Sequence, residues 1–208
     1  MRESPVKSGT RALGIAESTH QRSGRCVICG AVVRADRVVD GFSFATATVG
    51  GLDATDAVCT LFERLDREDV QYLLVSGVAP AWFNVLDLDR IASATERPVL
   101  SISFEESPGL ERALRRHFDG DALDARLERY ERLPPRRRLR VNDETLFVRS
   151  VGLDGDAQHV DGEAAPEETE DAPSDAEMAP EEIENAPNDA EVARVVRAYT
   201  PAGGRPEP

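Results

Sequence analysis

The longest concentration of apolar residues lies in residues 69–89, which read DVQYLLVSGVAPAWFNVLDLD. Within it, residues 70–76 form a short and nearly all-apolar run that ends at Ser76. Such a run predicts a strand buried on both faces, in the middle of a partly parallel sheet. Because ligands of open α/β sheets bind outside the carboxyl ends of the strands, we expect the chemistry of this chain near residues 76–89.

Three apolar segments precede this strand. They cover residues 10–17, 25–34 and 38–49 and contain many residues that favour strands. The connections between them are too short for parallel crossovers, which need a dozen or more residues. The three segments therefore predict an antiparallel meander.

Helices and strands alternate after the meander. Asp53 is predicted to cap a helix over residues 54–66, whose apolar positions recur every three or four residues. Asn84 is predicted to cap a second helix that ends near Thr95, with Asp87 three residues after the cap. The other elements predicted here are a strand over 99–104, helices over 108–118 and 121–130, and a hairpin over 139–151.

This order predicts an α/β fold with a mixed five-stranded sheet, in which three antiparallel strands are followed by parallel crossovers with helices on both faces. It is the strand order of the ribonuclease H-like fold. We expect residues 1–8 to be a flexible leader, residues 9–154 to form the ribonuclease H-like domain, and residues 188–208 to dock on it as a C-terminal helix and tail.

Acidic residues are concentrated between the domain and that last helix. Fifteen Asp and Glu and no Lys or Arg lie between Val151 and Val192, so this segment accounts for more than the whole formal charge of −14. It contains two similar 14-residue stretches, APEETEDAPSDAEM and APEEIENAPNDAEV, with repeated proline and few large apolar residues. The composition predicts that residues 155–187 are an acidic disordered insertion, whose protein partner, if it has one, the sequence does not identify.

The chain has no apolar stretch long enough to cross a membrane, and its first residues lack the apolar core of a signal peptide. Its three cysteines, an odd number, imply no disulfide framework. We therefore expect a cytoplasmic protein without a membrane partner.

Four segments, SGTRALGIAES, DGFSFATATVGGLDAT, LLVSGVAPAWFNVLDLD and RPVLSIS, resemble an archaeal family of uncharacterised proteins related to endonuclease V, the domain-of-unknown-function family number ninety-nine. The end of the chain, EVARVVRAYTPAGGRPEP, resembles the last helix of that family. The resemblance covers about residues 9–154 and 188–208 and implies a ribonuclease H-like fold. It also implies cleavage of nucleic acid with a divalent metal ion, Mg²⁺ or Mn²⁺.

The endonuclease V pattern implies an Asp in the first strand, an acid near the start of the first helix and an Asp at the end of the central strand. This chain has Ala16 and Ser76 at the two strand positions, and Asp53 near the helix. Because Mg²⁺ prefers oxygen ligands, an altered set of carboxylates is a candidate for the metal and for catalysis. The candidate catalytic residues are Glu17, Asp53 and Asp87, and Glu105 completes the metal set.

Two functions stay open at this point. In the first, the chain is a metal-dependent endonuclease with this altered carboxylate set, and the basic run Arg136, Arg137 and Arg138 binds phosphates. In the second, it is a catalytically silent relative, without a cofactor, that binds nucleic acid or a protein through a cleft. The cleft is predicted around Ser76, Trp82, Phe83 and Asn84.

Overall fold

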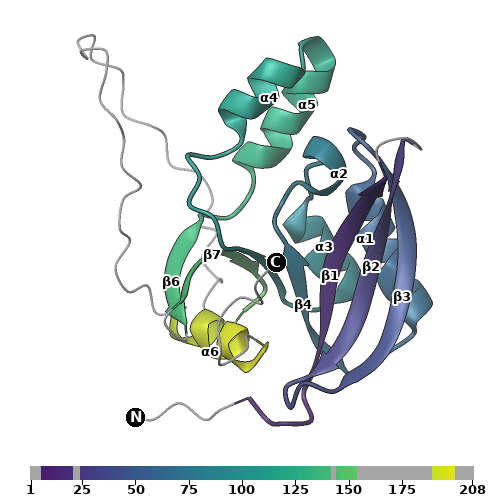
Figure 1. Cartoon of the computed structure of the whole chain (residues 1–208), viewed down its shortest axis with the longest axis vertical. Helices are drawn as coiled ribbons and strands as arrows, with labels where there is room; N and C mark the ends of the chain where they lie inside the picture. Colours follow the sequence, from purple (N-terminus) through teal and green to yellow (C-terminus); the bar gives the residue numbers. More distant parts are fainter. Residues whose placement is uncertain (1–5, 21–23, 142–143, 154–188, 200–208) are drawn as a thin grey trace.

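The computed structural model describes residues 6–20, 24–141, 144–153 and 189–199. Their strands form one mixed seven-stranded sheet with the order β3-β2-β1-β4-β5-β7-β6 (Figure 1). The strands are β1 (Arg11–His20), β2 (Arg25–Arg34), β3 (Val39–Thr48), β4 (Val70–Ser76), β5 (Val99–Ser103), β6 (Arg137–Val141) and β7 (Glu144–Val151).

The first five strands have the predicted order and directions. β1 pairs antiparallel with β2, β2 pairs antiparallel with β3, and β4 pairs in parallel with both β1 and β5. The predicted count of five strands is wrong, because the β6–β7 hairpin extends the sheet through antiparallel pairing of β7 with β5. The hairpin covers the hydrogen-bonding edge that β5 would otherwise expose.

Helices cover both faces of the central strands, as predicted. In β4, Leu73 and Val75 belong to a hydrophobic cluster with α1 and α3, whereas Tyr72 and Leu74 pack against a second cluster that contains α6. The alternation follows from the two-residue period of a strand. The helices are α1 (Ala54–Leu65), α2 (Pro80–Phe83), α3 (Leu88–Thr95), α4 (Glu111–His117), α5 (Gly120–Glu131) and α6 (Asp189–Tyr199).

The last helix docks on the sheet through its apolar side. Val192, Val195 and Val196 are fully or almost fully buried and share their cluster with Leu153, just after β7. The hydroxyl of Tyr199 donates a hydrogen bond of 3.0 Å to the backbone carbonyl of Thr10. The predicted acidic insertion, 155–187, lies outside the described residues, as do the first five residues of the predicted leader.

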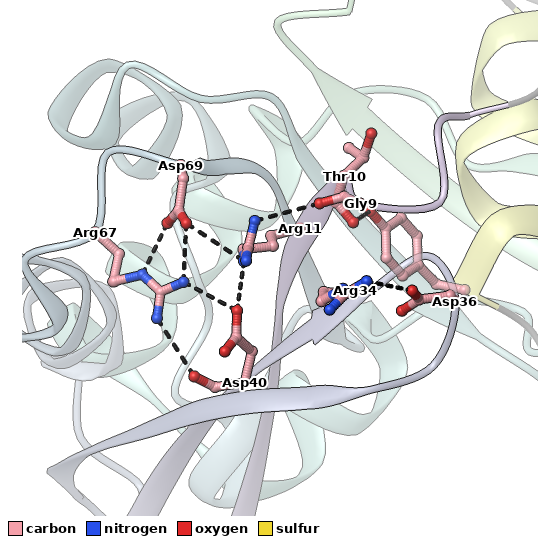
Figure 2. Close-up of polar contacts among 9 residues, drawn as sticks. Gly9, Thr10, Arg11, Arg34, Asp36, Asp40, Arg67 and Asp69 are labelled. Carbon is pink, nitrogen blue, oxygen red and sulfur yellow. Dashed lines mark hydrogen bonds and ion pairs between the residues drawn. The ribbon is translucent and has the colours of Figure 1, made fainter.

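A network of charges lies at the amino ends of β1, β3 and β4 (Figure 2). The guanidinium of Arg67 is 2.8 Å from the Asp69 carboxylate and 3.1 Å from that of Asp40. Arg11 adds contacts of 2.5 Å to Asp40 and 3.3 Å to Asp69. The network joins β1, its neighbour β4, and β3, which lies beyond β2, at the end of the sheet where these three strands begin.

In the described ranges, the structure contains no helix that is long and apolar enough to cross a membrane.

The predicted second helix is wrong in its start. α3 begins at Leu88, and the carboxylate of Asp87 caps it by accepting a hydrogen bond of 2.9 Å from the backbone N–H of Arg90. Asn84 precedes this helix without capping it. Its side chain forms its hydrogen bonds with the start of α1 instead, so a tertiary contact replaces the predicted local one.

Candidate active site

Three strands end at the same edge of the sheet. β3 and β4 both run in the direction of β1, so their carboxyl ends bring together Glu17, Thr48 and Ser76. The amino end of α1 lies at this edge too, because Asp53 hydrogen-bonds to Thr48. The predicted location of the chemistry therefore coincides with a real convergence of elements.

Asp53 holds the turn between β3 and α1. Its carboxylate accepts hydrogen bonds of 3.0 and 2.8 Å from the backbone N–H and the hydroxyl of Thr48. A third bond, of 2.8 Å, comes from the side-chain amide of Asn84. Asp53 occupies the N-cap position of α1, as predicted, but its side chain makes no capping hydrogen bond.

Asn84 supplies the missing cap from a distant part of the chain. Its side-chain oxygen accepts a hydrogen bond of 3.0 Å from the backbone N–H of Ala54, the first residue of α1. Its amide nitrogen donates to the carbonyl of Thr48 at 3.0 Å as well as to Asp53. Asn84 is fully buried, and both ends of its amide are satisfied.

These contacts keep Asp53 ionised. Burial raises the pKa of its carboxyl, but the hydrogen bonds from Thr48 and Asn84 outweigh burial and bring the pKa below the usual value. A carboxylate that is partly buried and stays charged is the kind of group that metal ions and polarised N–H groups recognise.

Glu17 extends the buried row of β1 residues to the edge of the sheet. Its carboxylate accepts a hydrogen bond of 2.7 Å from the backbone N–H of Ala81. The buried thiol of Cys26 lies near both acids. Burial raises its pKa, a hydrogen bond from the backbone N–H of Ala47 lowers it, and the charges of Glu17 and Asp53 raise it further. Glu17 and Asp53 thus act on one thiol from two separate elements.

The turn after β4 has an unusual backbone. Three consecutive non-glycine residues, Ala81, Trp82 and Phe83, have positive φ angles of 51°, 57° and 62°. This conformation costs L-residues roughly 1–2 kcal/mol each, and such strain is concentrated at functional sites. The bond from Ala81 to Glu17 and a bond of 2.7 Å from the Gly50 N–H to the Ala81 carbonyl hold the turn in place.

The strained turn presents an aromatic cluster. The ring of Trp82 lies 5.6 Å from Phe83, 5.5 Å from His117 and 5.3 Å from Phe118, measured between ring centroids. Trp82 is 49% exposed, so part of its ring faces solvent. An exposed aromatic ring suits the stacking of a base.

Arg126 of α5 supports the same region, and no pattern in the sequence indicates this role. Its side chain is 3% exposed, its guanidinium lies 3.8 Å above the ring of Phe118, and it donates to the carbonyls of Gly50, Gly51 and Phe83. A single Arg in a charged helix is typical of a solvated surface. Arg126 is also far in the sequence from the other residues of the site. Its role could be found only from the packing of α5.

The four predicted metal ligands are not assembled. Among the residues that the structure describes, no three His, Cys, Asp or Glu side chains form a group that could hold a metal ion. Asp87 caps α3, and Glu105 is an exposed residue beyond the end of β5. Glu17 and Ser76 line a cavity of about 10 Å³, room for roughly one water molecule.

The predicted basic run is divided by the alternation of β6. Arg138 is exposed, Arg137 is half-buried, and Arg136, just before the strand, stacks on Phe147 at 4.2 Å. The three side chains therefore do not form one phosphate-binding row.

The fold and this edge define a class: an α/β protein with a mixed sheet and an acidic site at the carboxyl ends of its strands. The profile of the Endonuclease dU family matches residues 8–161, and the chain belongs to this family. The predicted relationship to an archaeal family of uncharacterised proteins is thereby confirmed.

Relatives agree with this assignment. A UPF0215 protein of Pyrobaculum aerophilum is 31% identical over 144 residues, which cover 68% of this chain and 76% of the relative. A UPF0215 protein of Thermococcus kodakarensis is 32% identical over 156 residues, which cover 72% of this chain and 78% of the relative.

Two solved structures are similar to this chain to different extents. A protein of unknown function from Archaeoglobus fulgidus superposes with a TM-score of 0.59 and 25% identity, over 69% of this chain and 79% of that one. The endonuclease V of Bacillus subtilis overlaps partially, with a TM-score of 0.36 and 16% identity, over 49% of this chain and 46% of that one.

Proposed function

We propose that this chain is an endonuclease that cuts nucleic acid at deoxyuridine and depends on Glu17 and Asp53. The name of its family, Endonuclease dU, supports the reaction and the substrate. The observation that carries the assignment to this edge is the pair of carboxylates that hydrogen bonds hold there, Glu17 of β1 by the Ala81 N–H and Asp53 at the start of α1 by Thr48. The strand order β3-β2-β1-β4-β5 supports a ribonuclease H-like domain over residues 9–154.

The nucleic acid lies, in this proposal, across the exposed ring of Trp82. Stacking of a base on an aromatic side chain is worth about 1–3 kcal/mol and tolerates any base. The strained turn fixes the direction of the ring, because the Ala81 N–H is bonded to Glu17. The backbone N–H of Ala81 therefore links the binding of a nucleic-acid strand at Trp82 to the position of the Glu17 carboxylate.

Mg²⁺ or Mn²⁺ is the cofactor that such a nuclease uses, and we propose that cleavage depends on one of them. The ion would supply a Lewis acid for the phosphate that is cut. In this proposal Glu17 and Asp53 are the carboxylates that would bind the ion, and Asp87 and Glu105 are further candidate ligands.

Cleavage of labelled oligonucleotides tests this function. The full chain is incubated with strands that contain one deoxyuridine, one inosine or neither, with Mg²⁺, with Mn²⁺ or with chelator. We expect cutting at deoxyuridine with metal ion and none with chelator. Glu17→Gln and Asp53→Asn should each lower the rate by about a hundredfold or more.

A matched control is Asp89→Asn. Asp89 is an exposed acid in the first turn of α3 and belongs to neither the proposed nor the predicted site. Thermal denaturation of each variant separates loss of cleavage from loss of fold. Absence of cutting by the unmodified chain on every strand with either metal would refute the nuclease function.

A second function is favoured by one observation. Both carboxylates already accept hydrogen bonds from the protein itself, and Ala16 and Ser76 stand where the endonuclease V pattern has Asp. A catalytically silent relative would still bind a strand through Trp82. In that case Trp82→Ala weakens binding of single-stranded DNA, while no cutting occurs in the unmodified chain.

A further inference from the structure

A second hollow lies beside the candidate active site. It is a cavity of about 270 Å³ beyond the carboxyl ends of β4 and β5. Its floor contains Ser101 and Ser103 of β5, and its wall contains the loop 77–79 that leads from β4 to the strained turn. Drug-sized ligands occupy pockets of about 300–1,000 Å³, so this one suits a smaller group.

Arg136 reaches into this cavity from the segment before β6. Its guanidinium donates to the carbonyl of Ser107 at 2.8 Å, to the carbonyl of Glu105 at 2.5 Å and to the hydroxyl of Ser103 at 3.2 Å. The ring of Phe147 lies beneath it, 4.2 Å from the guanidinium carbon. The side chain is thus held by neutral acceptors and an aromatic ring, which leave its positive charge uncompensated by an ion pair.

Arg149 of β7 lines the same cavity. Its guanidinium donates to the carbonyl of Pro134 and lies 5.5 Å above the ring of Tyr130. Tyr130 also lines the cavity, and its hydroxyl accepts a hydrogen bond of 3.2 Å from the backbone N–H of Leu110. Two arginines and four residues with hydroxyl groups therefore line one hollow, namely Arg136 and Arg149 with Ser101, Ser103, Ser107 and Tyr130.

Neither guanidinium forms an ion pair with an acid, although the charge of Glu106 acts on Arg136 and Glu105 is one of the residues that line the cavity. In the ranges that the structure covers, no carboxylate oxygen lies within ion-pair distance of Arg136 or Arg149. The backbone of Glu105 accepts from Arg136, but its side chain does not pair with it. A partly buried charge without a partner is unfavourable, and an anion in the cavity would remove that cost.

The two charges also disfavour each other. Burial is the largest cause that lowers the pKa of both side chains, and the charge of Arg136 lowers the pKa of Arg149 further. Both guanidinium groups stay protonated, because arginine is not deprotonated in proteins. A bound anion would neutralise this repulsion.

We propose that this cavity is a binding site for a phosphate group, held by Arg136 and Arg149 with the hydroxyls of Ser101, Ser103 and Tyr130. The planar fork of arginine matches the oxygens of a phosphate, and phosphate offers enough acceptors for two such groups at once. A phosphate of a nucleic-acid strand and the phosphate of a free mononucleotide share this chemistry. The site goes beyond the proposed cleavage, because it concerns binding alone and needs no metal.

Binding to the full chain tests the site in the presence of chelator, where no cleavage occurs. The probes are inorganic phosphate, deoxyuridine monophosphate and a short single-stranded DNA without deoxyuridine, measured by calorimetry. Arg136→Gln and Arg149→Gln should each weaken phosphate binding by about tenfold or more, the loss expected for one charged hydrogen bond. Arg140→Gln is the control, since Arg140 is exposed on β6 and does not line the cavity.

A second measurement uses the unmodified chain and does not depend on how variants fold. A dicarbonyl reagent that modifies arginine is applied with and without phosphate, and the modified sites are found by mass spectrometry. Phosphate should protect Arg136 and Arg149 and leave Arg140 unchanged.

The outcomes distinguish the two sources of phosphate. If the DNA strand displaces inorganic phosphate, the site holds a phosphate of the strand. If the mononucleotide alone displaces it, the site holds a free nucleotide. Absence of binding by every probe, or equal binding in both Gln variants and the unmodified chain, overturns the proposal. Because all these measurements exclude metal, they fail or succeed independently of the cleavage assay.

Discussion

The side-chain amide of Asn84 donates a hydrogen bond of 2.8 Å to the carboxylate of Asp53, and its oxygen caps α1 at the adjacent residue. One buried side chain therefore fixes both a helix start and a candidate catalytic acid. This contact holds together the loop after β4 and the start of α1, although Asn84 and Asp53 are 31 residues apart in the sequence.

Substitution of Asn84 should lower stability strongly. Asn84→Ala leaves the buried Ala54 N–H without its partner, and such a buried unsatisfied group costs about 1–3 kcal/mol. It also removes the hydrogen bonds to the Thr48 carbonyl and to the Asp53 carboxylate. We expect a loss of about 2–4 kcal/mol in the free energy of unfolding, measured by urea denaturation. Asp89→Asn, on the exposed side of α3, should change it by less than about 0.5 kcal/mol. Equal stability of the two variants would contradict the capping role.

The three acids with lowered pKa values predict a loss of stability in acid. Hydrogen bonds from Arg11 and Arg67 lower the pKa of Asp40, and a hydrogen bond from Arg67 lowers that of Asp69. For Asp53, burial raises the pKa and the bonds from Thr48 and Asn84 lower it more.

The sign follows from linkage. A carboxyl whose pKa is lower in the folded state stabilises the fold above its unfolded pKa, about 3.9 for Asp, and this contribution disappears as the pH falls through the folded value. Unfolding by urea should therefore become easier from about pH 4 downward. In the Asp40→Asn and Asp69→Asn double variant the decrease should be smaller. An unchanged pH profile in that variant would exclude the network as its source.

Gly30 marks a close approach between β2 and α1. A Cβ atom there would lie 2.6 Å from Cδ2 of Leu61 and 2.9 Å from Cδ1 of Leu13, and both leucines are fully buried. Gly30→Ala should therefore destabilise the protein by about 1–3 kcal/mol through overpacking. In Gly14→Ala the nearest atom is a carbonyl oxygen at 3.8 Å, so the unfolding midpoint should change little.

A double variant checks the cause of the Gly30 effect. Combined with Leu61→Ala, the Gly30→Ala substitution should cost less than the sum of the two single effects, because the added methyl group then has room. Additive losses would indicate that the two residues do not crowd each other.

Arg126 should be required for the order of the strained turn. Arg126→Met removes the donors from the carbonyls of Gly50, Gly51 and Phe83, with an expected loss of about 2–4 kcal/mol. Hydrogen exchange of the turn around Trp82 should accelerate in this variant. Arg132→Met removes only an exposed pair with Glu128 at 3.7 Å and should have no measurable effect on either quantity.

The regular elements of the sheet could be predicted because their signals are local. The bounds of β2 and β4 agree with the predicted ranges, and α1 was predicted to within one residue. Their apolar periods depend on the strand or helix itself and on the face that it buries. The five predicted strands also appear with the predicted order and directions.

The candidate site could be predicted less well, because contacts between residues that are distant in the sequence form it. Asn84 and Asp87 together match a local capping pattern, yet only Asp87 caps α3, while Asn84 turns to α1. Arg126 has the sequence context of a surface residue and is 3% exposed. Polar groups that are satisfied across the fold leave no periodic signal in the sequence.

Leu153, just after β7, and Val192 of α6 belong to one hydrophobic cluster. Two residues that are far apart in the sequence thus come together in the fold. Each doubling of a connecting segment costs only about 0.6 kcal/mol of closure entropy. Natural selection can therefore lengthen, shorten or recompose this connection while the domain stays intact, and a protein engineer could insert a reporter domain at the same position.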